Sequence, residues 1–281
     1  MPATIRPDFL PAQPPHHVTS SIIDFTATTP PIPEYEDCFA AVIDNFMTEA
    51  ECNELLSLAE QSTTEPGKWE RAMINAGNGK QVMVTDTRNC GRIMFDSPEI
   101  ADRLLARLKP FFERWNMVKL QNQLPVTGIA GRKNVYNLTR LNERLRFLKY
   151  VGGEYFKTHV DGKYRTPDGS EMSFYTIQLY LNGEGEEGQD LKELARRKQK
   201  GFNGQNIERT DQEKLLGGAT SFSPSWRDTN QDVRVWPKAG RILVFQHNNL
   251  WHGGDSVYGG VKYTVRTDVL YSKSPLSDLP A

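Results

Sequence analysis

The sequence has little cysteine, almost no net charge and no long hydrophobic run. Its three cysteines, Cys38, Cys52 and Cys90, lack metal-ligand spacing, and their odd number favours a reduced, cytoplasmic chain over a disulfide framework. A net charge of −1 gives no reason to expect a nucleic-acid or membrane surface. No apolar stretch is long enough to span a bilayer. The first fifteen residues also lack the apolar segment of a signal peptide, so we expect none.

The chain of 281 residues is long enough to bury a substantial core in one large domain or two small ones. Residues 1–33 hold many of the prolines and show little apolar periodicity, so we expect a flexible tail there. Residues 34–281 then form one domain. Within it, the polar, glycine-rich stretch at about 183–216 reads as a surface insertion with a helix-like piece at 191–200.

Two helices are expected in the first half of this domain. Thr48 and Glu51 have the spacing of a capping box, which predicts a helix through about Gln61. A second helix is expected over 97–115, with Pro98 at its first position. The apolar positions that should be buried recur at helical spacing: Cys52, Leu55, Leu56, Ala59, Ile100, Leu104, Leu108 and Phe111.

The second half of the chain reads mainly as strands punctuated by glycine and proline. The expected strand segments are 39–46, 135–142, 145–161, 174–181, 217–222, 233–237, 240–246 and 261–271. Helices first and many antiparallel strands afterwards favour a β-rich α+β fold. The specific expectation is a double-stranded β-helix (jelly roll) with the N-terminal helices packed on the outside.

The stretch 145–161 is the centre of the functional interpretation. It reads as a strand, a Gly-Gly turn and a second strand that leads into His159 and Asp161. Because alternate residues of a strand point to one face, an imidazole and a carboxylate would enter the same space. His252 lies about ninety residues downstream, at the end of another expected strand. The three residues match a 2-His-1-carboxylate set, which leaves open positions on a non-heme Fe(II).

A second polar cluster follows His252. Lys262, Thr264 and Arg266 alternate along one expected strand and therefore share a face. A 2-oxoglutarate carboxylate buried beside the metal would need such a cation, since an unpaired buried charge is costly. If the face pointed outward instead, both cations would only be solvated.

These segments together resemble the Fe(II)/2-oxoglutarate-dependent dioxygenases, specifically the prolyl 4-hydroxylase-like branch. The matching pieces are LRFLKYVGGEYFKTHVD, the YLN after it, GGATSF, P-x-x-G-x-I-L-V-F and HGGDSVYGGVKY, and AVIDNFMTEAECNELLSLAE is similar to the helical entry of that branch. The resemblance implies Fe(II), 2-oxoglutarate and O2 as cofactors. It also implies oxidation of an unactivated C–H bond, by hydroxylation or a related two-electron oxidation, with release of succinate and CO2.

The resemblance also implies residue roles. His159, Asp161 and His252 match the iron ligands, and Tyr150 matches a tyrosine that hydrogen-bonds the co-substrate. Lys262 matches the basic anchor for the distal carboxylate of 2-oxoglutarate. Arg266 is a rival for that role, and Thr264 lies between the two.

The sequence leaves the substrate open among a peptidyl proline, an amino acid and a small metabolite. Ala219 stands where the prolyl hydroxylases usually carry Glu, and the 183–216 insertion is longer than the common connection. Candidate substrate contacts are a polar loop and two aromatics, each of which could instead be solvated or packed: Arg88, Asn89, Arg92, Trp226 and Trp251.

Alternatives to a dioxygenase are a Zn- or Mn-dependent hydrolase or isomerase on the same fold, and a jelly-roll module that binds without catalysis. The paired cations after His252 speak against the first, and the complete ligand set speaks against the second. His247 lies five residues before His252, so strand alternation does not put it on the same face, and we expect a structural role. His16 and His17, in the N-terminal segment, are expected to be solvated.

Overall fold

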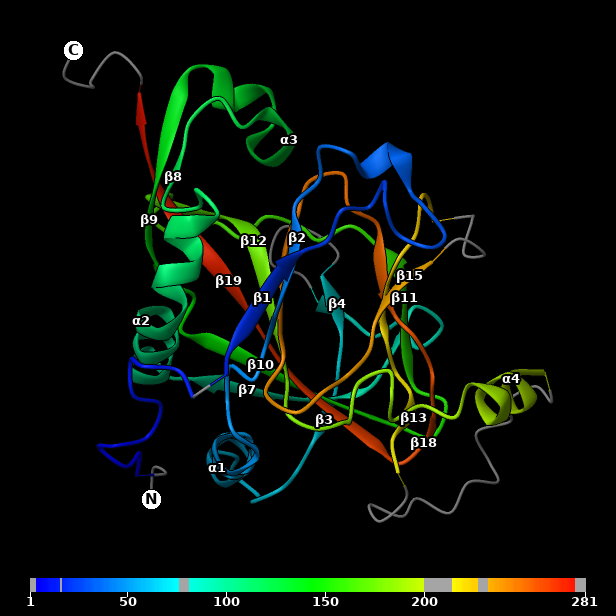
Figure 1. Ribbon diagram of the computed structural model, residues 1–281. Helices are drawn as coiled ribbons and strands as arrows, with labels where there is room; N and C mark the ends of the chain where they lie inside the picture. Colours follow the sequence, from blue (N-terminus) through cyan, green and yellow to red (C-terminus); the bar gives the residue numbers. More distant parts are fainter. Residues whose placement is uncertain (1–3, 16, 76–80, 200–213, 227–231, 276–281) are drawn as a thin grey trace.

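Two antiparallel β-sheets contain most of the strands that the structure describes (Figure 1). The structure is a computed structural model, and it describes residues 4–15, 17–75, 81–199, 214–226 and 232–275. His16 lies outside these residues. The β-rich α+β class predicted from the sequence is confirmed.

The larger sheet has ten strands among the described residues. Its order along the main path is β1 (Thr19–Ile22), β2 (Ala40–Asp44), β16 (Ile242–Gln246), β12 (Glu171–Tyr180), β19 (Val261–Pro275), β10 (Arg144–Val151), β7 (Gly91–Asp96) and β3 (Glu70–Arg71). Off this path, β9 (Asn134–Leu141) pairs with β19, and β8 (Lys119–Leu120) pairs with β9. The long strand β19 therefore contacts three other strands and ties the sheet together.

The smaller sheet has the order β15 (Val233–Val235), β14 (Thr220–Phe222), β17 (His252–Gly254), β11 (Tyr155–His159) and β6 (Arg88–Asn89). Two short pairs complete the described strands: β13 (Leu216–Gly217) with β18 (Val257–Gly259), and β4 (Ile74–Asn75) with β5 (Gln81–Val82). The described helical segments are α1 (Glu49–Gln61), α2 (Pro98–Arg114), α3 (Leu124–Thr127), α4 (Leu191–Gln199), η1 (Pro33–Tyr35) and η2 (Ile129–Arg132).

The two faces of the larger sheet have different chemistry. Along β19, Val265 and Val269 belong to the main hydrophobic core, which also contains buried residues of α1 and α2. Lys262 and Arg266 alternate with them and line a pocket on the opposite face. The period of two in a strand thus separates a hydrophobic side, covered by the helices, from a polar side that faces the smaller sheet.

Helix α1 begins as its sequence predicts. The Thr48 side chain accepts a hydrogen bond from the Glu51 backbone N–H at 3.1 Å, and the Thr48 backbone N–H donates to the Glu51 carboxylate at 2.8 Å. This capping box satisfies two backbone groups at the helix start. The buried positions are Cys52, Leu55, Leu58 and Ala59, so Leu58 replaces the expected Leu56.

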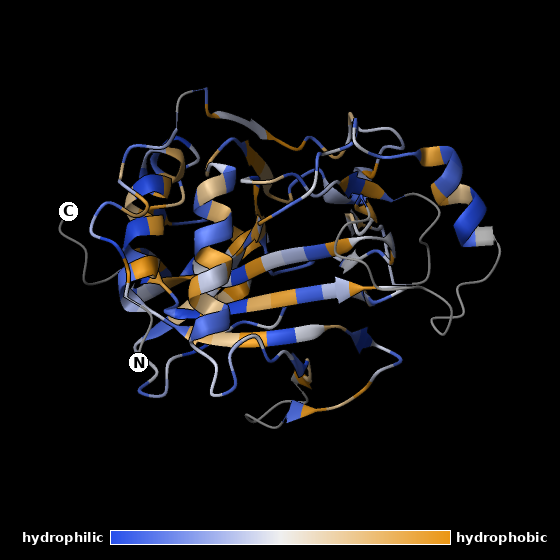
Figure 2. Ribbon diagram, turned by 90° about the horizontal axis from the view of Figure 1, so that it is seen from below, coloured by the Kyte–Doolittle hydropathy of each residue, from blue (hydrophilic) through white to orange (hydrophobic). Residues whose placement is uncertain are grey.

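Helix α2 also matches its prediction. Ser97 caps it by accepting a hydrogen bond from the Ile100 N–H at 3.3 Å, and Pro98 occupies the first turn. All four apolar positions expected to face the core are buried: Ile100, Leu104, Leu108 and Phe111. Hydrophobic and hydrophilic residues alternate along both helices (Figure 2).

The N-terminal segment differs from the expected flexible tail. Residues 19–22 form strand β1 against β2, and the side chains of Phe9 and Leu10 are buried in the main core. Phe25 packs in a second hydrophobic cluster. Apolar periodicity did not reveal this packing, because a proline-rich segment without periodicity can still bury single large side chains in the core. The placement of a domain boundary near residue 33 stays a prediction.

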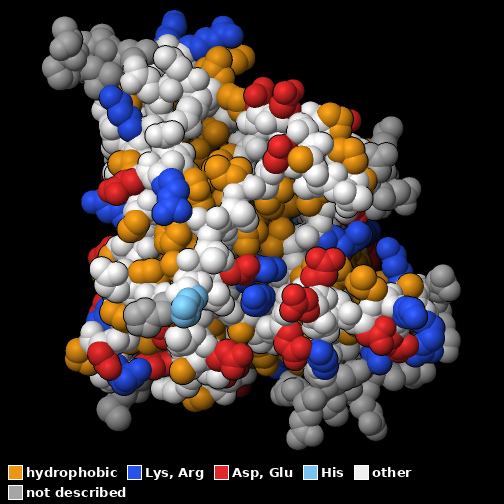
Figure 3. All heavy atoms as spheres, viewed as in Figure 1, with side chains coloured by type: hydrophobic (Ala, Val, Ile, Leu, Met, Phe, Trp, Pro, Cys, Tyr) orange, Lys and Arg blue, Asp and Glu red, His pale blue; other side chains and the backbone are white. Residues whose placement is uncertain are grey.

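Helix α4 lies in the expected insertion, where the helix-like piece was predicted, and 200–213 of that insertion lie outside the described residues. None of the described helices combines the length and hydrophobicity needed to cross a membrane. On the face shown in Figure 3, basic and acidic side chains are interspersed, so this face presents no field of a single sign.

Candidate active site

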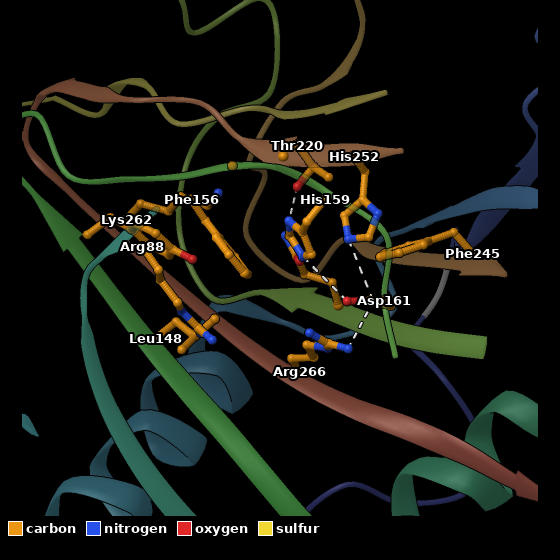
Figure 4. A pocket seen from close by; sticks show the side chains of 14 residues that line it. Arg88, Leu148, Phe156, His159, Asp161, Thr220, Phe245, His252, Lys262 and Arg266 are labelled. Carbon is orange, nitrogen blue, oxygen red and sulfur yellow. Dashed lines mark hydrogen bonds and ion pairs between the residues drawn. The ribbon is translucent and has the colours of Figure 1, made fainter. Parts of the chain in front are cut away.

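The three residues predicted as metal ligands come together between the two sheets (Figure 4). Strands β11 and β17 pair antiparallel, with His159 opposite His252 in the register. One ligand atom from each of these histidines and one from Asp161 lie within 4.8 Å of one another. Asp161 lies beyond the end of β11 rather than on it, so the strand alternation used in the sequence argument does not itself position the carboxylate.

Both imidazoles point the same nitrogen toward the centre of the site. His159 Nδ1 lies 2.8 Å from the Lys157 carbonyl oxygen, and His252 Nδ1 lies 3.1 Å from the Leu250 carbonyl oxygen. A carbonyl only accepts, so each Nδ1 carries the proton and each Nε2 presents a lone pair. The buried Nε2 of His159 has no hydrogen-bond partner among the described residues.

The charge states also suit metal binding. Burial lowers the pKa of His252 to about 3, so its imidazole is neutral at ordinary pH. Burial opposes ionisation of Asp161, but the Arg266 guanidinium, followed by His252, outweighs it and holds the pKa of that carboxyl well below its usual range. The site therefore offers the neutral imidazole of His252 and the carboxylate of Asp161 beside His159.

Only one oxygen of Asp161 is left free for a metal. Its Oδ2 accepts a hydrogen bond from the Thr176 hydroxyl at 2.6 Å and lies 2.9 Å from an Arg266 guanidinium nitrogen. Its Oδ1 lies 3.4 Å from His159 Nε2. Two Nε2 atoms and one carboxylate oxygen form a donor set suited to Fe(II), and a monodentate carboxylate keeps the remaining positions open.

Behind the carboxylate lies a buried polar network that the sequence interpretation missed. Thr176 has a single hydroxyl proton, which it donates to Asp161. The contact of 3.0 Å between Thr176 Oγ1 and His247 Nε2 therefore runs from the histidine to the hydroxyl. Asp268 Oδ1 lies 3.8 Å from the same His247 nitrogen and ion-pairs with Arg146 at 2.8 Å through its other oxygen. His247 thus lies off the pocket, as expected, but supports a candidate ligand through Thr176.

Lys262 lies on the other side of the pocket. Its side chain is buried, with Nζ 5.0 Å from the centroid of the Tyr150 ring and 5.7 Å from that of Tyr180. Burial lowers the pKa of Lys262 to about 8. Tyr150 lines the same pocket, and burial raises the pKa of its phenol well above the usual value, so the hydroxyl stays protonated and can donate.

Arg266 also lines the pocket, but it already has anionic partners. It contacts Asp161 at 2.9 Å and Asp268 at 3.7 Å. Thr264 shares the face of β19 with Lys262 and Arg266, and no described residue forms a hydrogen bond with its buried hydroxyl. Of the two cations proposed as anchors, Lys262 is the one that forms no ion pair with a carboxylate among the described residues.

The candidate substrate contacts divide into one residue in the pocket and four outside its lining. Arg88 lines the pocket and lies over the Phe156 ring. Asn89 accepts a hydrogen bond from Arg71, and Arg92 donates to Gln81 at 3.1 Å.

Neither tryptophan lines the pocket. Trp226 is 57% exposed, and Trp251 packs against the second hydrophobic cluster. The lining residues not identified from the sequence include Phe156, Gln178 and Phe245. Phe156 stacks on His159 with ring centroids 3.7 Å apart, and Phe245 lies edge-on to His252 at 4.5 Å. Of these three residues, only Phe156 could have been suggested by the sequence, because it lies near His159 in the same expected strand segment.

Comparison with known proteins gives distant structural likenesses. A viral collagen prolyl hydroxylase from Paramecium bursaria Chlorella virus-1 is 16% identical, with 83% of this chain and 96% of that chain covered and a TM-score of 0.43. A prolyl-4-hydroxylase from Pseudomonas putida is 13% identical, with 85% and 96% covered and a TM-score of 0.46. A Trichoplax adhaerens prolyl hydroxylase, solved with a hypoxia inducible factor peptide, is 14% identical, with 89% and 82% covered and a TM-score of 0.40. These likenesses are too distant to assign a residue role or a substrate.

Among curated proteins, no relative matches. A family comparison is informative: residues 145–267, which include all three candidate ligands and both candidate anchors, match the model of the 2OG-Fe(II) oxygenase superfamily. Over this stretch the chain is similar to the 2OG-Fe(II) oxygenases, and the donor set of His159, Asp161 and His252 supports a 2-oxoglutarate-dependent non-heme iron dioxygenase.

Proposed function

We propose that the enzyme oxidises an unactivated C–H bond of an amino acid, a small metabolite or a peptidyl proline, with release of succinate and CO2. The observation that supports this most directly is the arrangement of three free donor atoms beside a buried lysine in one pocket. The proposal includes a double-stranded β-helix formed by the two sheets, assignment to the prolyl 4-hydroxylase-like branch, and a cytoplasmic location.

In this proposal His159, Asp161 and His252 hold Fe(II), which would supply the activation of O2. Lys262 pairs with the distal carboxylate of 2-oxoglutarate, and Tyr150 donates a hydrogen bond to the co-substrate. Arg266 and Thr176 fix the Asp161 carboxylate through its second oxygen. Phe156 and Phe245 flank the two imidazoles and limit the access of water.

The experiment is direct. Purified protein is supplied with Fe(II), 2-oxoglutarate and O2, and succinate is measured with and without candidate substrates, with the product mass determined. We expect slow succinate release alone and faster release with a substrate. Absence of succinate under both conditions, with Fe(II) bound, contradicts the proposal. A Zn- or Mn-dependent hydrolase would not consume 2-oxoglutarate.

A further inference from the structure

The pocket contains a buried cation that the iron and co-substrate roles do not use. The Arg88 side chain comes from β6, and the residue is 8% exposed. Within the part of the chain that the structure describes, its buried Nε has no hydrogen-bond partner. Among the described residues no carboxylate forms an ion pair with it; its guanidinium instead lies 4.6 Å from the centroid of the Phe156 ring. An aromatic face offsets only part of the cost of burying a charge.

Arg88 is close to the candidate metal. Strands β6 and β11 pair with Arg88 opposite Phe156, and Phe156 stacks on His159. Figure 4 shows Phe156 between the arginine and the histidine. A ligand group bound by Arg88 would therefore lie close to His159, with only the ring of Phe156 between the arginine and the histidine.

Two other arginines near the site are paired with carboxylates, and Arg88 is not. Arg266 and Arg146 are matched by Asp161 and Asp268, which they contact directly. In the loaded enzyme, Fe(II) and Lys262 would carry three positive charges against the two negative charges of 2-oxoglutarate. Arg88, which forms no ion pair with a carboxylate among the described residues, adds to this excess of positive charge inside a pocket where an unpaired charge is costly.

We propose that Arg88 binds a carboxylate of the substrate, so that the enzyme acts on a small organic acid, such as a free amino acid, rather than on a residue inside a peptide chain. The guanidinium can pair a carboxylate through two parallel hydrogen bonds, a geometry that also fixes orientation. This inference rests on the proposed function, and it narrows the substrate class for the same site.

Acetate and acetamide test this inference, because they have the same shape and differ in charge. The protein is first saturated with Fe(II) and 2-oxoglutarate without O2, and the visible absorption of the chelate is recorded. Acetate is then titrated and its effect on that absorption measured. We expect acetate to bind wild-type protein and acetamide to bind at least about tenfold more weakly.

The matched variants are Arg88→Gln and Arg92→Gln. Both remove one buried arginine charge from the same stretch of chain, but Arg92 does not line the pocket. Arg88→Gln should weaken acetate binding about tenfold or more, whereas Arg92→Gln should not. The KM for 2-oxoglutarate should rise far less in Arg88→Gln than in Lys262→Met.

Each other outcome has a definite meaning. Equal binding of acetate by wild type and Arg88→Gln, or equal effects of acetate and acetamide, overturns the inference; the second comparison needs no variant to fold. A KM for 2-oxoglutarate that rises as much in Arg88→Gln as in Lys262→Met assigns Arg88 to the co-substrate and also overturns it. If the chelate absorption itself does not form, the proposed function fails instead.

Discussion

At the scale of single residues, the three candidate ligands should be indispensable for iron. His159→Ala, His252→Ala and Asp161→Ala should each abolish Fe(II) binding and turnover, because each removes one of three donor atoms. The two histidine variants should stay folded. Asp161→Ala should also lose stability, since it leaves the charge of Arg266 less well paired. Metal content, succinate release and thermal unfolding measure these effects, and near-normal activity in any variant contradicts the assignment.

The two cations of β19 should differ in their effect on the co-substrate. They lie four residues apart, or about 13 Å along the strand, so both cannot hold the same carboxylate equally. Because Arg266 is already paired with Asp161, we expect Lys262→Met to raise the KM for 2-oxoglutarate roughly 30- to 900-fold. This change corresponds to a loss of ~2–4 kcal/mol in the free energy of co-substrate binding.

Arg266→Met should raise the same KM less than about tenfold and should weaken Fe(II) binding instead, because it removes a contact to Asp161. Steady-state kinetics at varied 2-oxoglutarate and a separate Fe(II) titration distinguish the two effects. If neither substitution changes the KM, this strand does not hold the co-substrate.

The buried lysine also predicts a pH dependence. Its pKa is lowered to about 8, so the cationic form predominates below pH 8 and is lost as the pH rises above it. The value of kcat/KM for 2-oxoglutarate, which reports the free enzyme, should therefore fall above about pH 8. In Lys262→Arg the guanidinium stays charged, so the decline should disappear. An unchanged decline in that variant assigns the titration to another group.

At the scale of elements, local signals predicted the helices better than the loops. The capping box at Thr48 and the proline at position 98 predicted the starts of α1 and α2, since such signals depend on residues within one helical turn. Strand alternation correctly grouped Lys262 with Arg266. It did not account for Asp161, whose place beyond β11 depends on contacts with Thr176, fifteen residues later.

The support of Asp161 by strand β12 gives a further prediction. Thr176→Val keeps the shape of the side chain but removes the hydroxyl that joins Asp161 to His247. The affinity for Fe(II) should fall about 10- to 100-fold, as is typical when a hydrogen-bond partner of a metal ligand is lost. Thr176→Ser retains the hydroxyl and should stay close to wild type. Equal losses in both variants would point to packing rather than to the hydrogen bond.

At the scale of the whole molecule, the site depends on pairings that no local pattern reveals. His159 meets His252 because β11 pairs with β17, and Arg88 joins them because β6 pairs with the other edge of β11. The spacing of the candidate ligands, supported by the resemblance to a known family, indicated the ligand set, but the sequence alone could not separate Arg88 from Asn89 and Arg92. Burial and pocket lining, which are properties of the assembled sheets, make that distinction.

The insertion offers a test at the same scale. None of its described residues up to Gln199 belongs to a hydrophobic cluster, so deleting 184–213 and closing the gap with a short glycine-rich turn should leave the two sheets folded. The Gln189 side chain accepts a hydrogen bond from the Gly217 backbone N–H at 2.7 Å. The neighbouring Gly218 packs so closely on Lys262 that an added Cβ would lie 3.0 Å from its Cδ.

Loss of Gln189 should therefore loosen the support of Lys262. We expect the deletion to raise the KM for 2-oxoglutarate and to reduce substrate-stimulated succinate release more than substrate-free release. Gln189→Ala is the matched control for the hydrogen bond alone and should reproduce only the change in KM. Thermal unfolding and the two succinate assays measure the outcome. The ends to be joined lie on the surface, so the new turn itself should not disturb folding. An insoluble deletion variant would therefore show that the insertion is part of the folded core.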